Sequence, residues 1–159
     1  MKKVYQTRFT IQDKGNCAQA CIASILELEL NEAFDVSQYG DEEFYDALCT
    51  WLLERGYYMI CFPYLGRDNK PLKLPGYYII GGEQVTSGVK HVEVAYNGEI
   101  IHDPISPNFI SEIFPTEIWL IYPLNPVSVV VSNHSKQPKK GKEADLRRLV
   151  ERQFETKPF

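Results

Sequence analysis

The sequence lacks any apolar run that could cross a bilayer. No stretch approaches the roughly 18 apolar residues of a membrane-spanning helix, and the opening MKKVYQTRF has no apolar core of the kind found in signal peptides. A surplus of positive charge is also missing, because the formal net charge is -4. Without that surplus, nucleic-acid binding is not favoured. We therefore expect a cytoplasmic protein that binds neither a membrane nor nucleic acid.

Cysteine and histidine are scarce, with 4 and 3 copies in the chain. The cysteines form no Cys-x-x-Cys pair, and none has a histidine at the spacing of a zinc finger. The pattern therefore argues against a zinc site, and we expect no metal and no organic cofactor. In a reducing compartment the cysteines should be free thiols. Their positions are Cys17, Cys21, Cys49 and Cys61.

What the sequence does contain predicts one domain with helices first and strands afterwards. A chain of 159 residues that is 44% hydrophobic can bury one sizeable core. A short opening strand, KVYQTRF, and two helices, 17–30 and 41–55, are expected in the first part. The segments that follow are aromatic and β-branched, punctuated by Gly and Pro, and predict strands: YYMICFPY, GYYIIGG, VKHVEVAY, GEIIHDP and EIWLIYPL. The fold class is therefore α+β, with helices packed on an antiparallel sheet.

Beyond residue 131 the composition changes. SNHSKQPKKGK predicts a basic linker, and EADLRRLVERQF predicts an amphipathic helix. We therefore divide the chain into a domain at 1–131 and a linker with a C-terminal helix at 132–159. The apolar side of that helix needs cover from its own domain, a second copy or a partner protein. The basic residues favour a solvated surface, because no aromatic side chains that would stack on bases are interleaved.

Two cysteines occupy different places on the first predicted helix. Cys17 begins it, where unpaired backbone N–H groups favour the negative charge of a thiolate. Asn16 directly before it is a good N-cap residue. Cys21 lies one turn further in and is expected to be core. Gln12, on the loop that leads into the helix, can supply an oxyanion donor beside the Cys17 backbone N–H. Taken singly, Cys17 could equally be a small buried side chain of the core. Gln12 could equally be a solvated residue of a polar loop.

A cysteine nucleophile needs a general base and a group that orients the base. His91 enters the first strand of a predicted hairpin, and Asp103 leaves its second strand. His102 adjoins Asp103, so its side chain should point to the opposite face of the sheet. His134 falls in the predicted linker. His91 is therefore the best candidate for the base, with Asp103 as its partner.

The turn of this hairpin decides whether the pair can meet. A two-residue turn at Asn97-Gly98 would place His91 opposite Pro104 and put Asp103 on the other face of the sheet. A three-residue loop with a bulge at Gly98 would make His91 and Asp103 cross-strand neighbours on one face. The sequence permits both registers. A catalytic pair requires the second, or an equivalent bulge.

The ordered set resembles a known family. Gln, then Cys at the head of a helix, then His at the head of a strand and Asp at the end of the next is the order in papain-like cysteine peptidases. More narrowly, Q-x4-C-x3-C followed by H-V-x-V and D-P is similar to the bacteriocin-processing peptidases that remove double-glycine leaders, and to their stand-alone relatives, over residues 8–124. The resemblance implies a papain-like fold, with Cys17 as nucleophile, His91 as base, Asp103 as orienting residue and Gln12 as oxyanion donor.

The resemblance also implies a peptide or protein substrate and hydrolysis of a peptide or amide bond. That family usually has Asp-Cys-Gly where this chain has Asn16-Cys17-Ala18. Two other functions remain open from the residues alone. The chain can be a binding or effector protein that keeps the fold without turnover, or an acyltransferase of the same architecture.

Overall fold

The computed structural model describes residues 1–9, 15–40, 43–64 and 71–125. The chain divides into two compact units, Met1–Leu124 and Asn125–Phe159. All helices and strands given below belong to the first unit. The linker and helix predicted at 132–159 lie outside the described residues, as does Gln12.

Two α-helices and two short 3-10 turns form the first part of the chain: α1 Cys17–Leu26, η1 Leu30–Glu32, η2 Val36–Gln38 and α2 Phe44–Glu54. Both predicted helices are present, but α1 ends four residues earlier than expected. Glu27 adopts a left-handed conformation with φ of 59° and so stops the helix, and the Leu28 N–H then donates to the Ala23 carbonyl. Among the described residues no helix is both long enough and apolar enough to cross a membrane.

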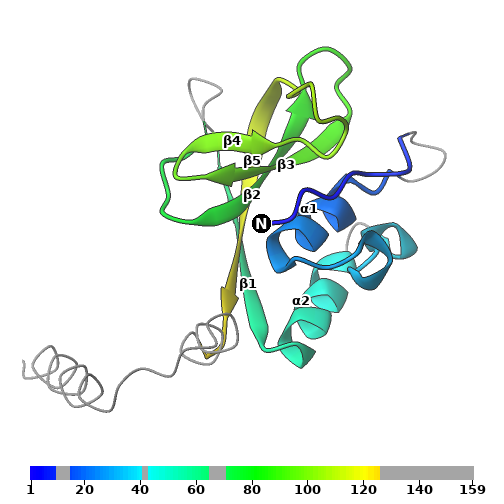
Figure 1. Ribbon diagram of the computed structural model, residues 1–159, viewed down its shortest axis with the longest axis vertical. Coiled ribbons are helices and arrows are strands. Elements are labelled where there is room, and N and C mark those ends of the chain that lie inside the picture. The colour runs from blue at the N-terminus through cyan, green and yellow to red at the C-terminus, as the bar shows by residue number, and fades with distance from the viewer. Residues whose placement is uncertain (10–14, 41–42, 65–70, 126–159) are drawn as a thin grey trace, which may run out of the picture. The chain divides into compact units, whose positions relative to one another are not determined.

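Five antiparallel strands form one sheet in the order β1-β5-β2-β3-β4. Figure 1 shows α1 and α2 side by side next to this sheet, with the N-terminus beside α1. The predicted α+β class with helices on an antiparallel sheet is confirmed, and each strand overlaps a predicted segment, although β5 begins at Ile113, before the predicted segment EIWLIYPL. The strands are β1 Tyr57–Pro63, β2 Tyr77–Gln84, β3 Lys90–Tyr96, β4 Glu99–His102 and β5 Ile113–Pro123.

The opening strand predicted from KVYQTRF is wrong, because the described part of this segment has no strand pairing. Its backbone finds other partners. The Val4 N–H donates to Ser24 Oγ on α1 at 3.0 Å, and the Gln6 N–H donates to the Pro104 carbonyl at 2.9 Å. The segment therefore ties the helix that begins at Cys17 to the chain that leaves β4.

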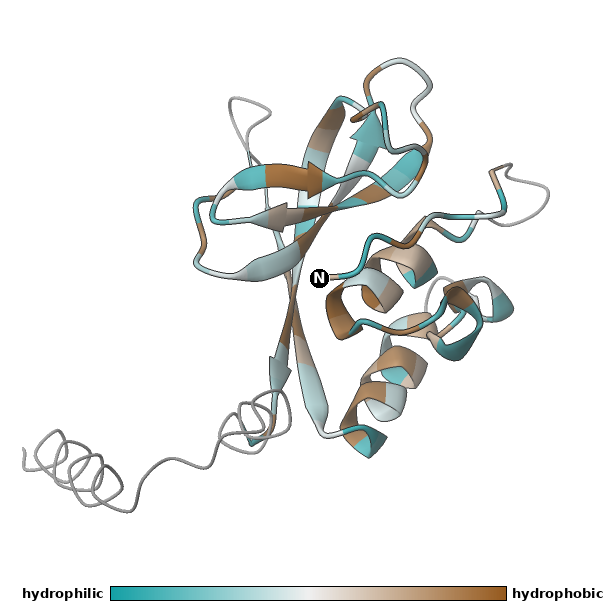
Figure 2. Ribbon diagram, viewed as in Figure 1, coloured by the Kyte–Doolittle hydropathy of each residue, from teal (hydrophilic) through white to brown (hydrophobic). Residues whose placement is uncertain are grey.

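Two clusters of buried side chains form the core. The larger joins the helices to the sheet and includes Cys21, Ile22, Leu48, Val92 and Trp119. The second contains strand residues whose side chains alternate with those of the first: Tyr78, Ile80, Ala95, Ile113 and Ile118. Figure 2 shows the brown, hydrophobic stretches on both helices and within the strands. The prediction that Cys21 is core is confirmed, since it is 0% exposed.

Gly82 allows β2 and β5 to approach closely beside the hairpin. It pairs with His91 on β3 and with Pro115 on β5, next to a register shift between Gly81 and Gly82. A Cβ atom at Gly82 would lie 2.0 Å from the backbone oxygen of Phe114. Only glycine fits this position without moving a strand.

We predict that Gly82→Ala lowers the free energy of unfolding by about 2 kcal/mol or more, because the added methyl group must displace backbone. Urea unfolding followed by circular dichroism measures this change. Gly40→Ala is the matched control and should have little effect, since a Cβ there meets nothing within 4 Å. Equal effects of the two substitutions would contradict the close approach at Gly82.

Candidate active site

The hairpin of β3 and β4 combines a tight turn with a bulge. Tyr96 pairs with Glu99, so the turn contains the two residues Asn97 and Gly98, both with positive φ (52° and 89°). The three-residue loop is therefore not formed. One residue further, Ala95 pairs with Ile100, but Val94 pairs with His102. Ile101 is left over as the extra residue of a bulge in β4.

The bulge reverses the facing of the residues that follow it. Without it, Asp103 would lie on the face opposite His91; with it, both side chains lie on one face. The Asp103 Oδ1 atom lies 3.0 Å from His91 Nε2. The equivalent bulge that a catalytic pair requires is thus present, and the prediction that the two side chains share a face is confirmed.

Asp103 is held from several sides. It is 2% exposed, and its carboxylate accepts the backbone N–H groups of Ile105 at 2.8 Å and Ser111 at 2.7 Å, besides the bond with His91. Burial on its own would raise the pKa of Asp103, but the hydrogen bonds from His91, Ile105 and Ser111 outweigh it and hold the pKa well below its usual range. Asp103 is therefore an anion with a fixed orientation.

His91 is buried as well, at 4% exposed. Burial of the imidazole opposes its protonation. Hydrogen bonds with Asp103 and with Cys17, together with the charges of these two groups, outweigh burial and raise the pKa of His91 to about 9. At neutral pH the ring is cationic, and its Nε2–H donates to Asp103. The second N–H of the cation, on Nδ1, is then available to another group.

Cys17 is the first residue of α1 and is partly buried against the larger core cluster. Asn16 occupies the N-cap position, as predicted, but its side chain makes no capping hydrogen bond. Instead, Asn16 Oδ1 accepts the backbone N–H groups of Thr7 at 3.0 Å and Arg8 at 2.9 Å. Asn16 is therefore the N-cap by position, as predicted, while its side-chain oxygen binds the opening segment and not the helix.

The other cysteine of α1 is placed for packing. Cys21 Sγ lies 3.5 Å from the Val92 carbonyl on β3, to which it donates. Burial, followed by the nearby charges of Cys17, Glu93 and Asp103, raises the pKa of the Cys21 thiol well above its ordinary value. Cys21 is thus kept as a neutral thiol, and its contact fixes α1 against the strand that carries His91.

His102 points away from this site, as expected from its place next to Asp103. Its Nε2 atom lies 2.8 Å from the Val4 carbonyl, and Tyr5 packs edge-on against the ring at 5.1 Å between centroids. Burial lowers the pKa of His102. Its contacts are those of a structural residue that anchors the opening segment.

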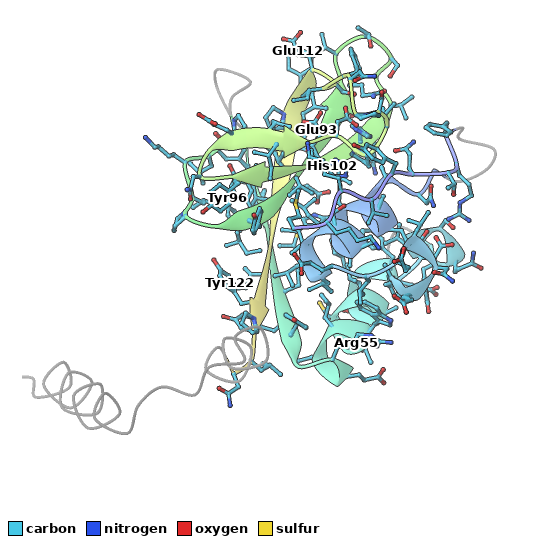
Figure 3. The ribbon with its side chains drawn as sticks, in the orientation of Figure 1. Arg55, Glu93, Tyr96, His102, Glu112 and Tyr122 are labelled. Carbon is cyan, nitrogen blue, oxygen red and sulfur yellow. The ribbon has the colours of Figure 1, made fainter. Side chains whose placement is uncertain are left out.

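Glu93 is the member of this cluster that sequence reasoning missed. It is 1% exposed and lies on β3 two residues after His91, so the two side chains share a face of the sheet. Figure 3 labels Glu93 within the sheet. Neither carboxylate oxygen has a hydrogen-bond partner. Burial and repulsion by Asp103 raise the pKa of Glu93 to about 8. The alternation in His-Val-Glu could have identified it, since His91 and Glu93 necessarily share a face.

The same three side chains form the candidate metal site in the described part of the chain. Ligand atoms of His91, Glu93 and Asp103 lie within 4.8 Å of one another. Asp103, however, already accepts hydrogen bonds from His91 Nε2 and from two backbone N–H groups. Both oxygens of Asp103 therefore have hydrogen-bond donors, so this carboxylate does not need a metal ion to balance its burial.

An open pocket with a volume of about 510 Å³ begins at Asn16, directly before Cys17. Its walls are mostly polar and come from the opening segment, α1 and the turns that follow. Arg8 and Asp35 meet in it, with Arg8 Nη2 2.7 Å from Asp35 Oδ1. The pocket therefore offers space and hydrogen-bonding groups next to the head of α1.

Comparison with known proteins identifies no relative. No protein-family model matches the chain, and no curated protein or solved structure matches it. The site is therefore interpreted from its own geometry. That geometry joins His91 to Asp103, and Cys17 is among the groups that raise the pKa of His91, while Gln12 lies outside the described residues.

We predict that His91 and His102 titrate on opposite sides of the ordinary histidine pKa of 6.5. His91 should titrate near pH 9 and His102 below 6.5, as measured from the ring proton and carbon shifts in NMR spectra. In Asp103→Asn, loss of the carboxylate should lower the pKa of His91 by about 1 to 3 units. A wild-type His91 that titrates at 6.5 would refute the ion pair.

Proposed function

We propose that this protein is a cysteine hydrolase of papain-like architecture that cleaves a peptide or amide bond. The observation that carries the proposal is the buried His91–Asp103 hydrogen bond, together with the influence of the Cys17 thiol, at the head of α1, on the pKa of His91. A cysteine, a histidine and a carboxylate in this order of contact form the constellation of a thiol nucleophile. A helix followed by an antiparallel sheet supports the architecture.

The chemistry follows from the charges. A cationic imidazole beside a thiol favours the thiolate, which is the nucleophilic form. The Cys17 thiolate attacks the substrate carbonyl carbon and forms a tetrahedral oxyanion. The C–N bond then breaks, the amine leaves with a proton from His91, and a thioester to Cys17 remains. His91 next takes a proton from water, which attacks the thioester and releases the acid, and this restores the Cys17 thiolate beside the cationic His91.

The oxyanion needs donors that are in place before the reaction. The backbone N–H of Cys17 stands at the N-terminus of α1, where the Asn16 side chain makes no capping hydrogen bond. Gln12 as the second donor remains a prediction. Asp103 keeps the ring of His91 in one orientation throughout, because three hydrogen bonds fix its own carboxylate.

A peptide substrate is supported by the pocket beside Asn16. Its open form and polar lining suit an extended chain whose amide groups need hydrogen-bond partners. The Arg8–Asp35 pair stands in the wall of this pocket, so a charged substrate side chain would meet a neutralised ion pair. We therefore favour a substrate that is uncharged where it faces Arg8.

We predict that iodoacetamide at neutral pH modifies Cys17 faster than any other cysteine of the chain. Cys61 is a built-in comparison: it is exposed, but burial of its thiol and the Glu117 charge raise its pKa to about 11. His91→Ala should slow the modification of Cys17 by about tenfold or more, while Cys61 is unaffected. Peptide mapping by mass spectrometry gives the rate at each site. Modification of Cys17 at the rate of a free, unactivated thiol, with no slowing in His91→Ala, would favour a binding protein without turnover.

We further predict that incubation with a peptide library or a cell lysate yields new peptide termini that depend on Cys17. Wild type and Cys17→Ala are compared by mass spectrometry, and Cys49→Ala serves as the matched control because it removes a thiol away from the site. New termini should appear with wild type and the control only. Acyl groups added to amines, without new acids, would instead identify an acyltransferase. Termini that are equal in all three samples would exclude cleavage of these substrates.

A further inference from the structure

Glu93 is a buried acid with no apparent partner. Both its oxygens are shielded from solvent and lack a hydrogen bond. Its side chain borders a pocket of about 180 Å³ whose other walls are largely isoleucine and proline, among them Ile80, Ile100 and Ile113. An ionised carboxylate in such a place is strongly unfavourable, so something must neutralise it.

The neighbours of Glu93 limit the possibilities. Asp103 repels the Glu93 carboxylate and His91 attracts it, but the positive charge of His91 is already engaged by Asp103. Cys21 on α1, whose pKa the Glu93 charge helps to raise, is a neutral thiol, and Glu112 borders the same pocket as Glu93 with a further acid. The described surroundings therefore supply more negative than positive charge.

A proton resolves this conflict. Two carboxyl groups in close contact cannot both ionise, and the one with the weaker hydrogen bonds keeps the proton. Asp103 has three donors, whereas neither oxygen of Glu93 has a hydrogen-bond partner, and the Ser111 N–H near Glu93 donates to Asp103. Asp103 Oδ1 accepts from His91 and Ile105, and Oδ2 accepts the backbone N–H of Ser111; the Ser111 hydroxyl and the Glu93 carboxyl group are the further groups that interact with this carboxylate. The pKa of Glu93, raised to about 8, agrees with this assignment.

The geometry points to Glu93 as a positioning residue whose protonated carboxyl group donates a hydrogen bond to Asp103 and holds the Asp103 carboxylate against His91. This role rests on the proposed function in one respect, namely that the His91–Asp103 pair serves Cys17. The hydrogen bond itself does not depend on catalysis. It can therefore be tested without a substrate.

The first test uses the pH dependence of stability. The pKa of Glu93 is near 4.5 in the unfolded chain and about 8 in the folded one. The folded state therefore binds the proton more tightly, and its stability falls as the pH rises from 4.5 to 8. Glu93→Gln cannot ionise and can still donate to Asp103.

Urea unfolding of wild type and Glu93→Gln at pH 5 and pH 8 measures this difference. The ratio of their unfolding equilibrium constants should change by about tenfold or more between the two pH values, in favour of the variant at pH 8. Glu112→Gln is the matched control, because Glu112 borders the same pocket but is exposed. Its ratio to wild type should stay constant. A constant ratio for Glu93→Gln would overturn the proposal.

The second test reads the position of Asp103 directly. The Nε2–H of a cationic His91 bonded to Asp103 gives a low-field proton NMR signal that exchanges slowly with water. The signal should be present in wild type and Glu93→Gln, and lost or fast-exchanging in Glu93→Leu, which has similar size but no donor. An unchanged signal in Glu93→Leu would show that Glu93 does not position Asp103.

These outcomes are separable from those of the hydrolase proposal. If Cys17 proves unreactive while both Glu93 measurements succeed, the acid pair stands and the catalytic use of His91 falls. If Glu93→Leu does not fold, the comparison of Glu93→Gln with wild type still decides the protonation, because the Gln variant retains size and polarity.

Discussion

The bulge at Ile101 is the constraint on which the rest of this site depends. The turn at Asn97-Gly98 is a tight two-residue turn, and a regular ladder from it would place Asp103 and His91 on opposite faces. One extra residue in β4 reverses this. It costs a break in the pairing of a short strand. In return, the Asp103 carboxylate lies 3.0 Å from the His91 ring, within a buried cluster.

The charges around this contact balance in a definite way. Asp103 is an anion because its hydrogen bonds lower its pKa by more than burial raises it. His91 is a cation because its interactions with Asp103 and Cys17 raise its pKa by more than burial lowers it. Glu93 is as deeply buried as Asp103, but its carboxyl oxygens have no hydrogen-bond partner. Burial therefore raises the pKa of Glu93, and the group keeps its proton. Identical chemistry at two carboxyl groups thus leads to opposite states, set by the number of donors that each one meets.

The sequence was sufficient for those features that depend on local periodicity. The strands of the sheet follow from alternating β-branched and aromatic residues, and α1 follows from a run of apolar residues after a polar loop. The sequence does not predict features that depend on which of several hydrogen-bond partners a backbone or side-chain group takes. KVYQTRF has the pattern of a strand, but its N–H groups bond to Ser24 and Pro104 instead. Asn16 has the identity of a cap, but its oxygen serves the opening segment.

The candidate site was predictable to a similar degree. The chemistry of Cys17, His91 and Asp103 suggested their grouping, and the requirement for a shared face predicted a bulge without fixing its place. Asn-Gly permits both turns, and the residues around it do not indicate that the extra residue is Ile101 in β4. Glu93 was missed because an acid within a strand is usually assigned to the solvent face.

The central claim is that Cys17, His91 and Asp103 act as one unit, with Asp103 acting through His91. A double-mutant cycle on the alkylation rate of Cys17 tests it most directly, using wild type, His91→Ala, Asp103→Asn and the double variant, each checked for folding by circular dichroism. Asp103→Asn should slow alkylation when His91 is present and have no further effect once His91 is absent. Independent, multiplicative effects of the two substitutions would contradict it.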